Sequence, residues 1–211
     1  MRRTKEDAEI TKENILISAM NLFFEKGYSK TTFDEIAKRI NLTKGAVYWY
    51  FRNKPDIVAA LINRYVREFL EKQAQTLPSD ENLTFNDLTE FVLRNSKLIQ
   101  KDEKVYKFVF FVSCQMEWSE AILTKISPLI EETKKYSRNL YYHCLEVLQK
   151  KGEIRKDVDI KLINEILITM YGGALEAFLT KRADVDFDTV IKKGFSLIYD
   201  GIKEKGKTDE N

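Results

Sequence analysis

The chain has 211 residues, of which 44% are apolar and 32% are charged, and its formal net charge is +2. This length and apolar content suit one compact domain, or a small domain joined to a larger one, with a substantial core. Two cysteines are too few for a disulfide framework, and three prolines and eight glycines are too few for a sheet protein with many turns.

The charge is spread unevenly along the chain. Residues 1–72 contain 14 basic and 10 acidic side chains, and the remainder contains 21 and 23. A basic N-terminal part on a slightly acidic body is typical of a phosphate-binding module on a neutral scaffold. The same charge balance is common in proteins that never bind DNA, so it does not by itself indicate a DNA-binding function.

We expect a soluble, cytoplasmic protein with no membrane segment. The first residues are charged and lack the apolar core of a signal sequence. The longest apolar run, Phe108 to Cys114, is too short to span a bilayer. Cys114 and Cys144 are predicted to be buried apolar residues.

The first helix is predicted from Thr11 to Phe24, where apolar residues recur at helical spacing. Gly27 follows it as a C-cap. Thr32 and Glu35 then have the spacing of a capping box, in which each side chain binds a backbone N–H that the helix itself leaves unpaired. A short helix is therefore predicted to begin after Thr32.

A second short helix is predicted directly after the first. Asn41 and Leu42 form a tight turn, and Thr43 caps a helix that ends at Tyr50. Asn53 caps the next helix, which runs from Pro55 to Leu77, with the proline in the first turn where no N–H is missed. Two short helices joined by a tight turn, with a longer helix packed before them, describe a helix-turn-helix unit.

Longer helices are predicted in the rest of the chain. Helical patterns cover residues 83–99 and 105–116, and Pro128 breaks or begins a helix that Gly152 ends after Lys151. The last two helices, about 160–178 and 187–202, have the clearest apolar stripes. We predict an all-α fold of about nine helices.

One segment carries a specific resemblance. The stretch Thr11 to Leu61 contains TTFDEIAKRINLTKGAVYWYFRNKPDIVAAL, and its string Gly45 to Phe51 followed by Asn53-Lys54 is the most telling part. It resembles the DNA-binding domain of the tetracycline-repressor (TetR) family, and most of all the repressors of multidrug efflux pumps. The resemblance covers roughly the first third of the chain. It implies a DNA-binding domain over residues 10–70, with the helix-turn-helix at about 32–51, and a helical ligand-binding and dimerisation domain over 71–205.

The resemblance also implies contacts with double-stranded DNA. Lys44 and Gly45 match the end of the recognition helix that reaches base edges in the major groove, and Lys54 matches a lysine that holds phosphate. The expected DNA-binding residues are Thr32, Thr43, Lys44, Gly45, Tyr48, Trp49, Tyr50 and Lys54. Efflux-pump repressors often have arginine at position 44 and histidine at position 50, so the operator sequence stays open. Tyr50 and Phe51 fit a partly buried core position equally well.

A homodimer is expected, because one short recognition helix reads only a few base pairs and a near-palindromic operator needs two. TetR-like proteins pair through their last two helices. The expected interface residues are Ile163, Leu167, Met170, Tyr171, Ala174, Phe187, Val190, Ile191, Phe195 and Ile198. The small residues Gly172, Gly173, Ala174 and Gly194 would permit close helix approach. The alternative for each residue is the core of its own chain.

The family usually builds a ligand cavity between the DNA-binding part and the dimer helices. Aromatic residues are frequent in the middle of this chain, and the expected lining residues for a small apolar or aromatic inducer are Phe69, Phe108, Phe111, Trp118 and Met170. Glu117 is a candidate partner for a cationic ligand. Ligand binding would favour a dimer whose recognition helices no longer fit adjacent grooves. Control by a protein partner, or the absence of any effector, is the alternative.

An enzyme is not expected. The chain's one histidine, His143, has no recognisable acid or nucleophile partner, and no phosphate-binding loop, dinucleotide glycine pattern or metal-ligand cluster is present in the sequence. No catalytic residue, cofactor or metal is therefore predicted.

Overall fold

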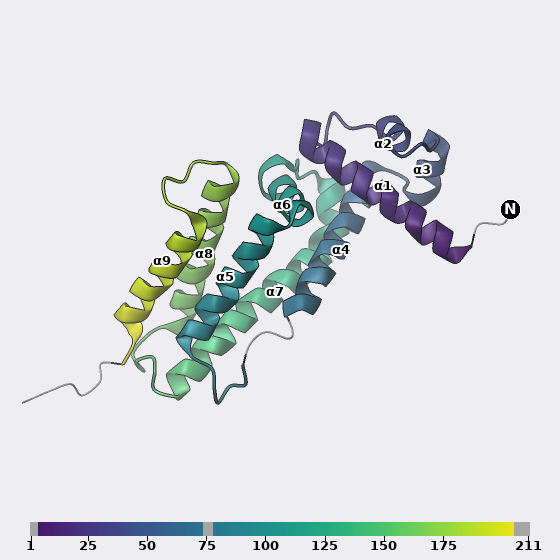
Figure 1. Cartoon of the computed structure of the whole chain (residues 1–211). Coiled ribbons are helices and arrows are strands. Elements are labelled where there is room, and N and C mark those ends of the chain that lie inside the picture. The colour runs from purple at the N-terminus through teal and green to yellow at the C-terminus, as the bar shows by residue number, and fades with distance from the viewer. Residues whose placement is uncertain (1–3, 74–77, 205–211) are drawn as a thin grey trace, which may run out of the picture. The chain divides into compact units, whose positions relative to one another are not determined.

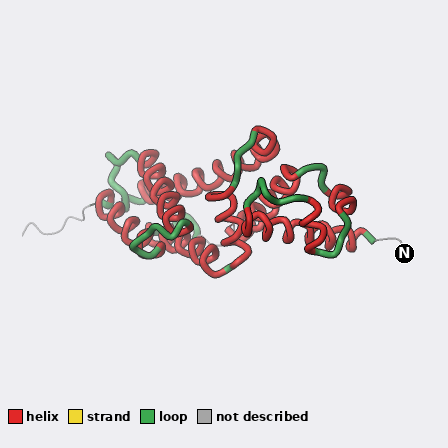
Figure 2. Tube along the Cα trace, turned by 90° about the horizontal axis from the view of Figure 1, so that it is seen from above, coloured by secondary structure: helices red, strands yellow, loops and turns green. Residues whose placement is uncertain are grey.

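The computed structural model describes residues 4–73 and 78–204, apart from the side chains at 69–73, 129–130 and 133–138. The helices are α1 (Lys5–Lys26), α2 (Phe33–Arg39), α3 (Lys44–Tyr50), α4 (Lys54–Gln73), α5 (Phe85–Lys101), α6 (Glu103–Phe110), the π-helical turn η1 (Phe111–Gln115), α7 (Glu120–Lys150), α8 (Ile160–Leu179) and α9 (Phe187–Ile202) (Figure 1). Within these described residues no strand occurs besides one isolated bridge, Ile154 to Lys203 (Figure 2). The predicted all-α fold is confirmed.

Contacts divide the chain into two compact units. Unit 1 comprises residues up to Glu71 together with Asp102–Glu131, and unit 2 comprises Lys72–Lys101 together with the residues from Glu132 onwards. Unit 1 thus holds α1 to α4, α6, η1 and the first turns of α7, while α5, the rest of α7, α8 and α9 belong to unit 2. The sequence analysis divided the chain between residues 70 and 71 according to expected function, whereas these units are defined by contacts. The functional boundary therefore stays a prediction.

Helix ends in unit 1 are determined by local sequence. The capping box of Thr32 and Glu35 is present as predicted, and Gly27 ends α1 at φ +89°, a conformation that favours glycine. A second capping box, Thr4 with Asp7, starts α1 six residues before the predicted Thr11. The apolar stripe alone missed this turn, because its side chains are exposed and charged.

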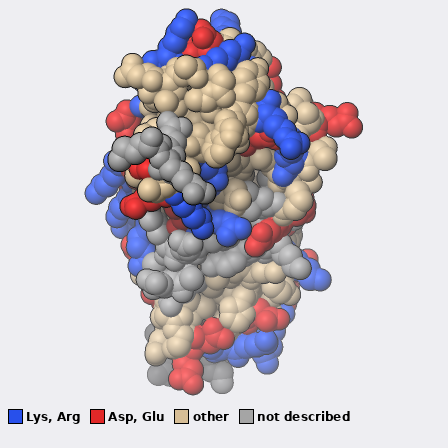
Figure 3. Space-filling model, turned by 90° about the vertical axis from the view of Figure 1, so that its right-hand side faces the viewer, with Lys and Arg blue, Asp and Glu red and all other residues tan. Residues whose placement is uncertain are grey.

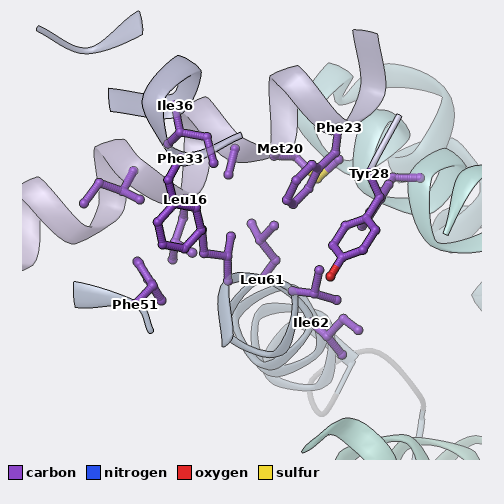
Figure 4. Close-up of a cluster of buried hydrophobic side chains, with 14 of the residues drawn as sticks. Leu16, Met20, Phe23, Tyr28, Phe33, Ile36, Phe51, Leu61 and Ile62 are labelled. Atoms are coloured by element: carbon purple, nitrogen blue, oxygen red, sulfur yellow. The ribbon is translucent and has the colours of Figure 1, made fainter. Parts of the chain in front are cut away.

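The core of unit 1 lies between α1, α2, α3 and α4. Its buried side chains include Leu16, Met20, Phe23, Ile36 and Leu61 (Figure 4). Four residues from distant sequence join the same cluster, and they are Phe111, Met116, Ile122 and Ile126. The N-terminal helices therefore share one core with η1 and the start of α7.

The middle of the chain departs from the sequence prediction in three ways. The helix predicted over 105–116 is α6 followed by η1, and α7 passes through Pro128 instead of breaking or beginning there. Pro128 costs that helix one hydrogen bond, but burial of Ile122 and Ile126 holds the turns before it. Cys114 is exposed, because η1 turns Phe111 into the core and Cys114 outward; Cys144 is buried as predicted, and burial raises the pKa of its thiol to about 11.

The core of unit 2 joins α5, α7, α8 and α9. Phe85, Leu88, Leu145, Leu167 and Phe195 are among its buried residues. Helices α8 and α9 pack side by side (Figure 1). At this contact a Cβ on Gly194 would collide with the Met170 sulfur, so the Met170 side chain would have to move to make room for it.

Helix α8 is more apolar than the sequence analysis recognised. Among the described helices it alone has the length and composition that could cross a bilayer, and only 17% of that stretch is buried. Counting uninterrupted apolar residues overlooked it, because Glu165 and Glu176 interrupt the run. Core helices of soluble proteins and signal sequences pass the same test, so the finding is weak by itself.

Candidate nucleic-acid interface

Helices α2 and α3 form a helix-turn-helix whose angle is fixed by buried contacts. Ala37 and Val47 are almost completely buried where the two helices meet. The turn is closed by a hydrogen bond from the Leu42 N–H to the Ala37 carbonyl (2.9 Å), and Asn41 takes the left-handed conformation, at φ +55°. In α1, the buried Ser18 hydroxyl donates to the Ile36 carbonyl at 3.0 Å, which ties the pair to the first helix.

The outer face of α3 is exposed and carries four of the predicted DNA-binding residues. Lys44 and Gly45 are exposed, Tyr48 is 50% exposed and Trp49 is 74% exposed. The Tyr48 ring packs against Phe33 at a centroid distance of 4.6 Å, and the Lys44 ammonium lies 5.7 Å from the Tyr48 ring. A face with one cation, two large aromatic side chains and a glycine can dock against phosphates, base edges and sugars.

Gly45 leaves room on this face. The nearest atom to a Cβ at this position would be the Thr43 hydroxyl oxygen, 3.9 Å away, which is an ordinary contact. The chain's own packing therefore does not require glycine here. A bare backbone near the start of α3 allows close approach of another molecule.

Three predicted contact residues have other partners within the chain. The Thr32 and Thr43 hydroxyls cap α2 and α3 by accepting hydrogen bonds from the backbone N–H groups of Glu35 and Ala46. The Tyr50 ring is half-buried, lies edge-on against Trp49 at 4.6 Å, and has a buried hydroxyl without a hydrogen-bond partner among the described residues. Tyr50 is thus partly a core residue, the alternative that its sequence left open.

Lys54, at the start of α4, is bound to the loop between α1 and α2. Its ammonium donates to the carbonyls of Tyr28 (2.7 Å) and Ser29 (3.1 Å) and lies 4.4 Å from the centre of the Tyr28 ring. Desolvation by burial lowers the pKa of Lys54. An ammonium has three N–H donors, so one donor is left for a phosphate.

Acidic side chains near the helix-turn-helix are paired with cations. Arg39 donates two hydrogen bonds to Glu25, at 2.7 and 2.6 Å, and Lys26 pairs with Glu35. The hydrogen bond from Lys26 is the largest cause that lowers the pKa of Glu35 to about 2. On the face drawn in Figure 3, basic and acidic side chains are interspersed.

The helix-turn-helix region and the chain as a whole are similar to known bacterial regulators. Residues 15–61 match the model of the family described as bacterial regulatory proteins, tetR family. The transcriptional repressor BepR of Brucella suis is 28% identical over 96% of this chain and 92% of its own length. Residues 15–61 form a DNA-binding domain of the tetR family. The matched residues contain the whole helix-turn-helix.

Solved structures of the family agree with the fold over nearly the whole chain. NalD, the secondary repressor of the MexAB-OprM multidrug efflux pump in Pseudomonas aeruginosa, is similar with a TM-score of 0.79 at 23% identity, covering 95% of this chain and 100% of NalD. SmeT, the repressor of the Stenotrophomonas maltophilia efflux pump SmeDEF, in a complex with triclosan has a TM-score of 0.71 at 21% identity and covers 93% of each chain. The TetR fold therefore extends through both units.

The predicted dimer residues differ in how far the chain itself buries them. Leu167, Phe187, Ile191 and Phe195 are buried in unit 2, and Ile163, Met170, Tyr171, Ala174 and Ile198 pack against that core, while Val190 is half-buried. Side chains buried within one chain leave little surface for a partner, and the dimer interface stays a prediction. The apolar residues exposed on α8 and α9 are Leu162 (57%), Ile166 (40%) and Leu197 (73%).

The predicted ligand-binding residues are divided between the two units. Phe111 is fully buried and stacks on Phe23 at 5.1 Å, and Phe108 stacks on Tyr65 at 4.2 Å. Trp118 is 44% exposed in unit 1, and Met170 packs on Gly194 in unit 2. The side chain of Phe69 lies outside the described residues. Glu117, the candidate partner for a cationic ligand, accepts a hydrogen bond from Ser29.

Two polar groups in the core of unit 2 had no signal in the sequence. Asn164 on α8 is 5% exposed, and its side-chain oxygen is buried without a hydrogen-bond partner among the described residues. Two turns further along the same face, burial raises the pKa of Tyr171 to about 12. Both residues lie in an apolar helix stripe, where periodicity predicts only packing. A hydrogen-bonding ligand is one way to satisfy such a group.

Nothing described points to catalysis. Among the described residues no group of three or more histidine, cysteine, aspartate or glutamate side chains is placed to hold a metal ion. His143 is half exposed, and its Nε2 lies 3.1 Å from a carboxylate oxygen of Asp80. This contact ties α7 to the loop before α5.

Proposed function

We propose that this chain represses transcription by binding a near-palindromic operator as a homodimer, and that a small apolar or aromatic ligand releases it. The exposed face of α3, held by a helix-turn-helix core, carries the proposal. Lys44, Gly45, Tyr48 and Trp49 would face the major groove, and Thr32, Thr43, Tyr50 and Lys54 would support the contact with the backbone. The relatives described as repressors support repression as the outcome.

Helices α8 and α9 support the homodimer. Leu162 and Ile166 lie one turn apart on the exposed face of α8, and a Cβ added at Gly172 or Gly173 on that helix would meet nothing within 4 Å. Exposed apolar side chains beside small residues permit close packing against a second copy. A two-fold dimer would place its recognition helices about 34 Å apart, at successive major grooves.

The ligand part of the proposal rests on the core of unit 2 and on the triclosan complex of SmeT. Asn164 offers a buried hydrogen-bond acceptor among apolar side chains. An apolar or aromatic molecule with one donor group fits this chemistry. We place the protein in the cytoplasm, where its operator is, and assign it no enzymatic activity.

The test starts with a duplex that the purified full-length chain selects from random sequences. We expect selection of a near-palindrome, binding of two chains per duplex, and loss of binding when a compound found by thermal-shift screening is added. Failure to enrich any sequence would contradict the proposal at its root. If DNA binds but no compound raises the melting temperature, control by a protein partner or the absence of an effector replaces the ligand.

A further inference from the structure

The loop between α1 and α2, residues 27–32, is held in place by side chains from outside the helix-turn-helix. It leads directly into Thr32, the N-cap of α2, so its shape determines where α2 starts. Within the loop, the Thr31 hydroxyl donates to the Gly27 carbonyl at 2.9 Å. Further contacts of this loop come from two distant segments of unit 1.

The segment that follows α6 supplies the first set of contacts. The Gln115 amide in η1 donates to the carbonyl of Phe24 in the last turn of α1, at 3.1 Å, and the Glu117 carboxylate accepts from the Ser29 hydroxyl. Carbonyls in the last turn of a helix have no partner within the helix, so Gln115 satisfies a group that α1 leaves open. Gln115 thus binds the end of α1 before the loop, and Glu117 binds the loop itself.

Helix α4 supplies the second set. Lys54 binds the carbonyls of Tyr28 and Ser29, and Asp56 pairs with Lys125 of α7 at 2.7 Å. The apolar contacts agree, because Met116, Ile122 and Ile126 lie in the same core as Tyr28. Residues 111–126 thus contact α1, the loop and α4 through both polar and apolar groups.

We propose that residues 111–126 form a brace that orients α2 and α3 for DNA binding, with Gln115 and Glu117 as positioning residues. The inference rests on the proposed function. It adds that an acidic side chain outside the helix-turn-helix strengthens operator binding. By charge alone, removing a carboxylate near a DNA-binding surface should tighten the complex. If residues 111–126 act as a brace, removing the Glu117 carboxylate should instead weaken DNA binding.

The experiment uses full-length Glu117→Ala, with Glu117→Gln as the conservative variant and Glu120→Ala as the matched control. Glu120 is an exposed acidic residue three positions away, with no side-chain partner among the described residues. We expect Glu117→Ala to bind the selected duplex about fivefold more weakly, the size typical of an indirect coupling. Glu117→Gln keeps an acceptor for Ser29 and should keep most of the affinity, and Glu120→Ala should bind as tightly as wild type or tighter.

Two further readouts separate positioning from general damage. Amide hydrogen exchange of residues 28–33 should accelerate in Glu117→Ala while the melting temperature stays within a few degrees. In a Ser29→Ala background, Glu117→Ala should have no further effect on affinity, because the effect acts through that hydroxyl. Binding by Glu117→Ala as tight as wild type, or a full effect in the Ser29→Ala background, would overturn the brace. A wild-type chain that selects no duplex would instead refute the proposed function.

Discussion

Lys44 and Lys54 carry the same charge in different surroundings. Lys44 is exposed on the outer face of α3, whereas Lys54 is half-buried and already donates two hydrogen bonds to loop carbonyls. A free, long donor at the start of a recognition helix is suited to read a base, and a fixed ammonium is suited to hold a phosphate. Substitution of Lys44 and of Lys54 should therefore change DNA binding in different ways.

Lys54→Ala should weaken binding to all duplexes and reduce the slope of log affinity against log salt by about 0.9, because one phosphate contact is lost. Lys44→Ala should keep most of that slope and lose about 1–3 kcal/mol of preference at particular base pairs. Titrations at several salt concentrations with operator and substituted duplexes measure both. Equal loss of base preference in the two variants would contradict this assignment.

Glu35 should make the stability of the folded protein depend on pH in the acidic range. Its pKa is about 2 in the folded protein, against 4.5 for the ordinary residue, because Lys26 and Thr32 bind its carboxylate. A lowered pKa stabilises the folded state above pH 4.5, and that contribution disappears as the pH falls toward 2. The melting temperature of wild type should therefore fall more steeply than that of Glu35→Gln over this range. Parallel curves would show that the pair does not contribute.

At the scale of the helices, sequence predicted best what local contacts determine. The capping box at Thr32 and the C-cap at Gly27 need only a few neighbouring residues, and both are present. The predicted dimer stripe includes Leu167 and Phe195, which are buried in the chain's own core, because α8 and α9 are apolar on two faces and periodicity does not tell which face meets that core. The contacts of Gln115 and Glu117 with α1 and its following loop had no signal in the sequence, because their partners lie about ninety residues away.

The exposed face of α8 should hold the dimer together. Leu162→Ser combined with Ile166→Ser should weaken association by about 3 kcal/mol, or roughly 100-fold, because two apolar side chains per chain leave the interface. Val185→Ser is the control, since Val185 is 51% exposed but lies in the loop between α8 and α9. Sedimentation equilibrium measures the dissociation constants. An unchanged dimer in the double variant would place the interface elsewhere.

At the scale of the whole molecule, the two compact units do not follow the order of the chain. Unit 1 takes α1 to α4, omits α5, and then takes residues 102–131. A boundary placed at residue 70 from the family resemblance marks where DNA-binding motifs end, but sequence alone could not show that later residues complete the same core. Helix α7 belongs to both units, with its first turns in one and the rest in the other.

This arrangement has a consequence for synthesis. A ribosome that has released α1 to α4 has delivered all of the expected DNA-contacting side chains, yet the aromatic ring that stacks on Phe23 has not been translated. The first four helices reach their final packing only after Ile126 has left the exit tunnel, when more than half of the polypeptide exists. A nascent chain shorter than that should not compete with finished repressor for the operator.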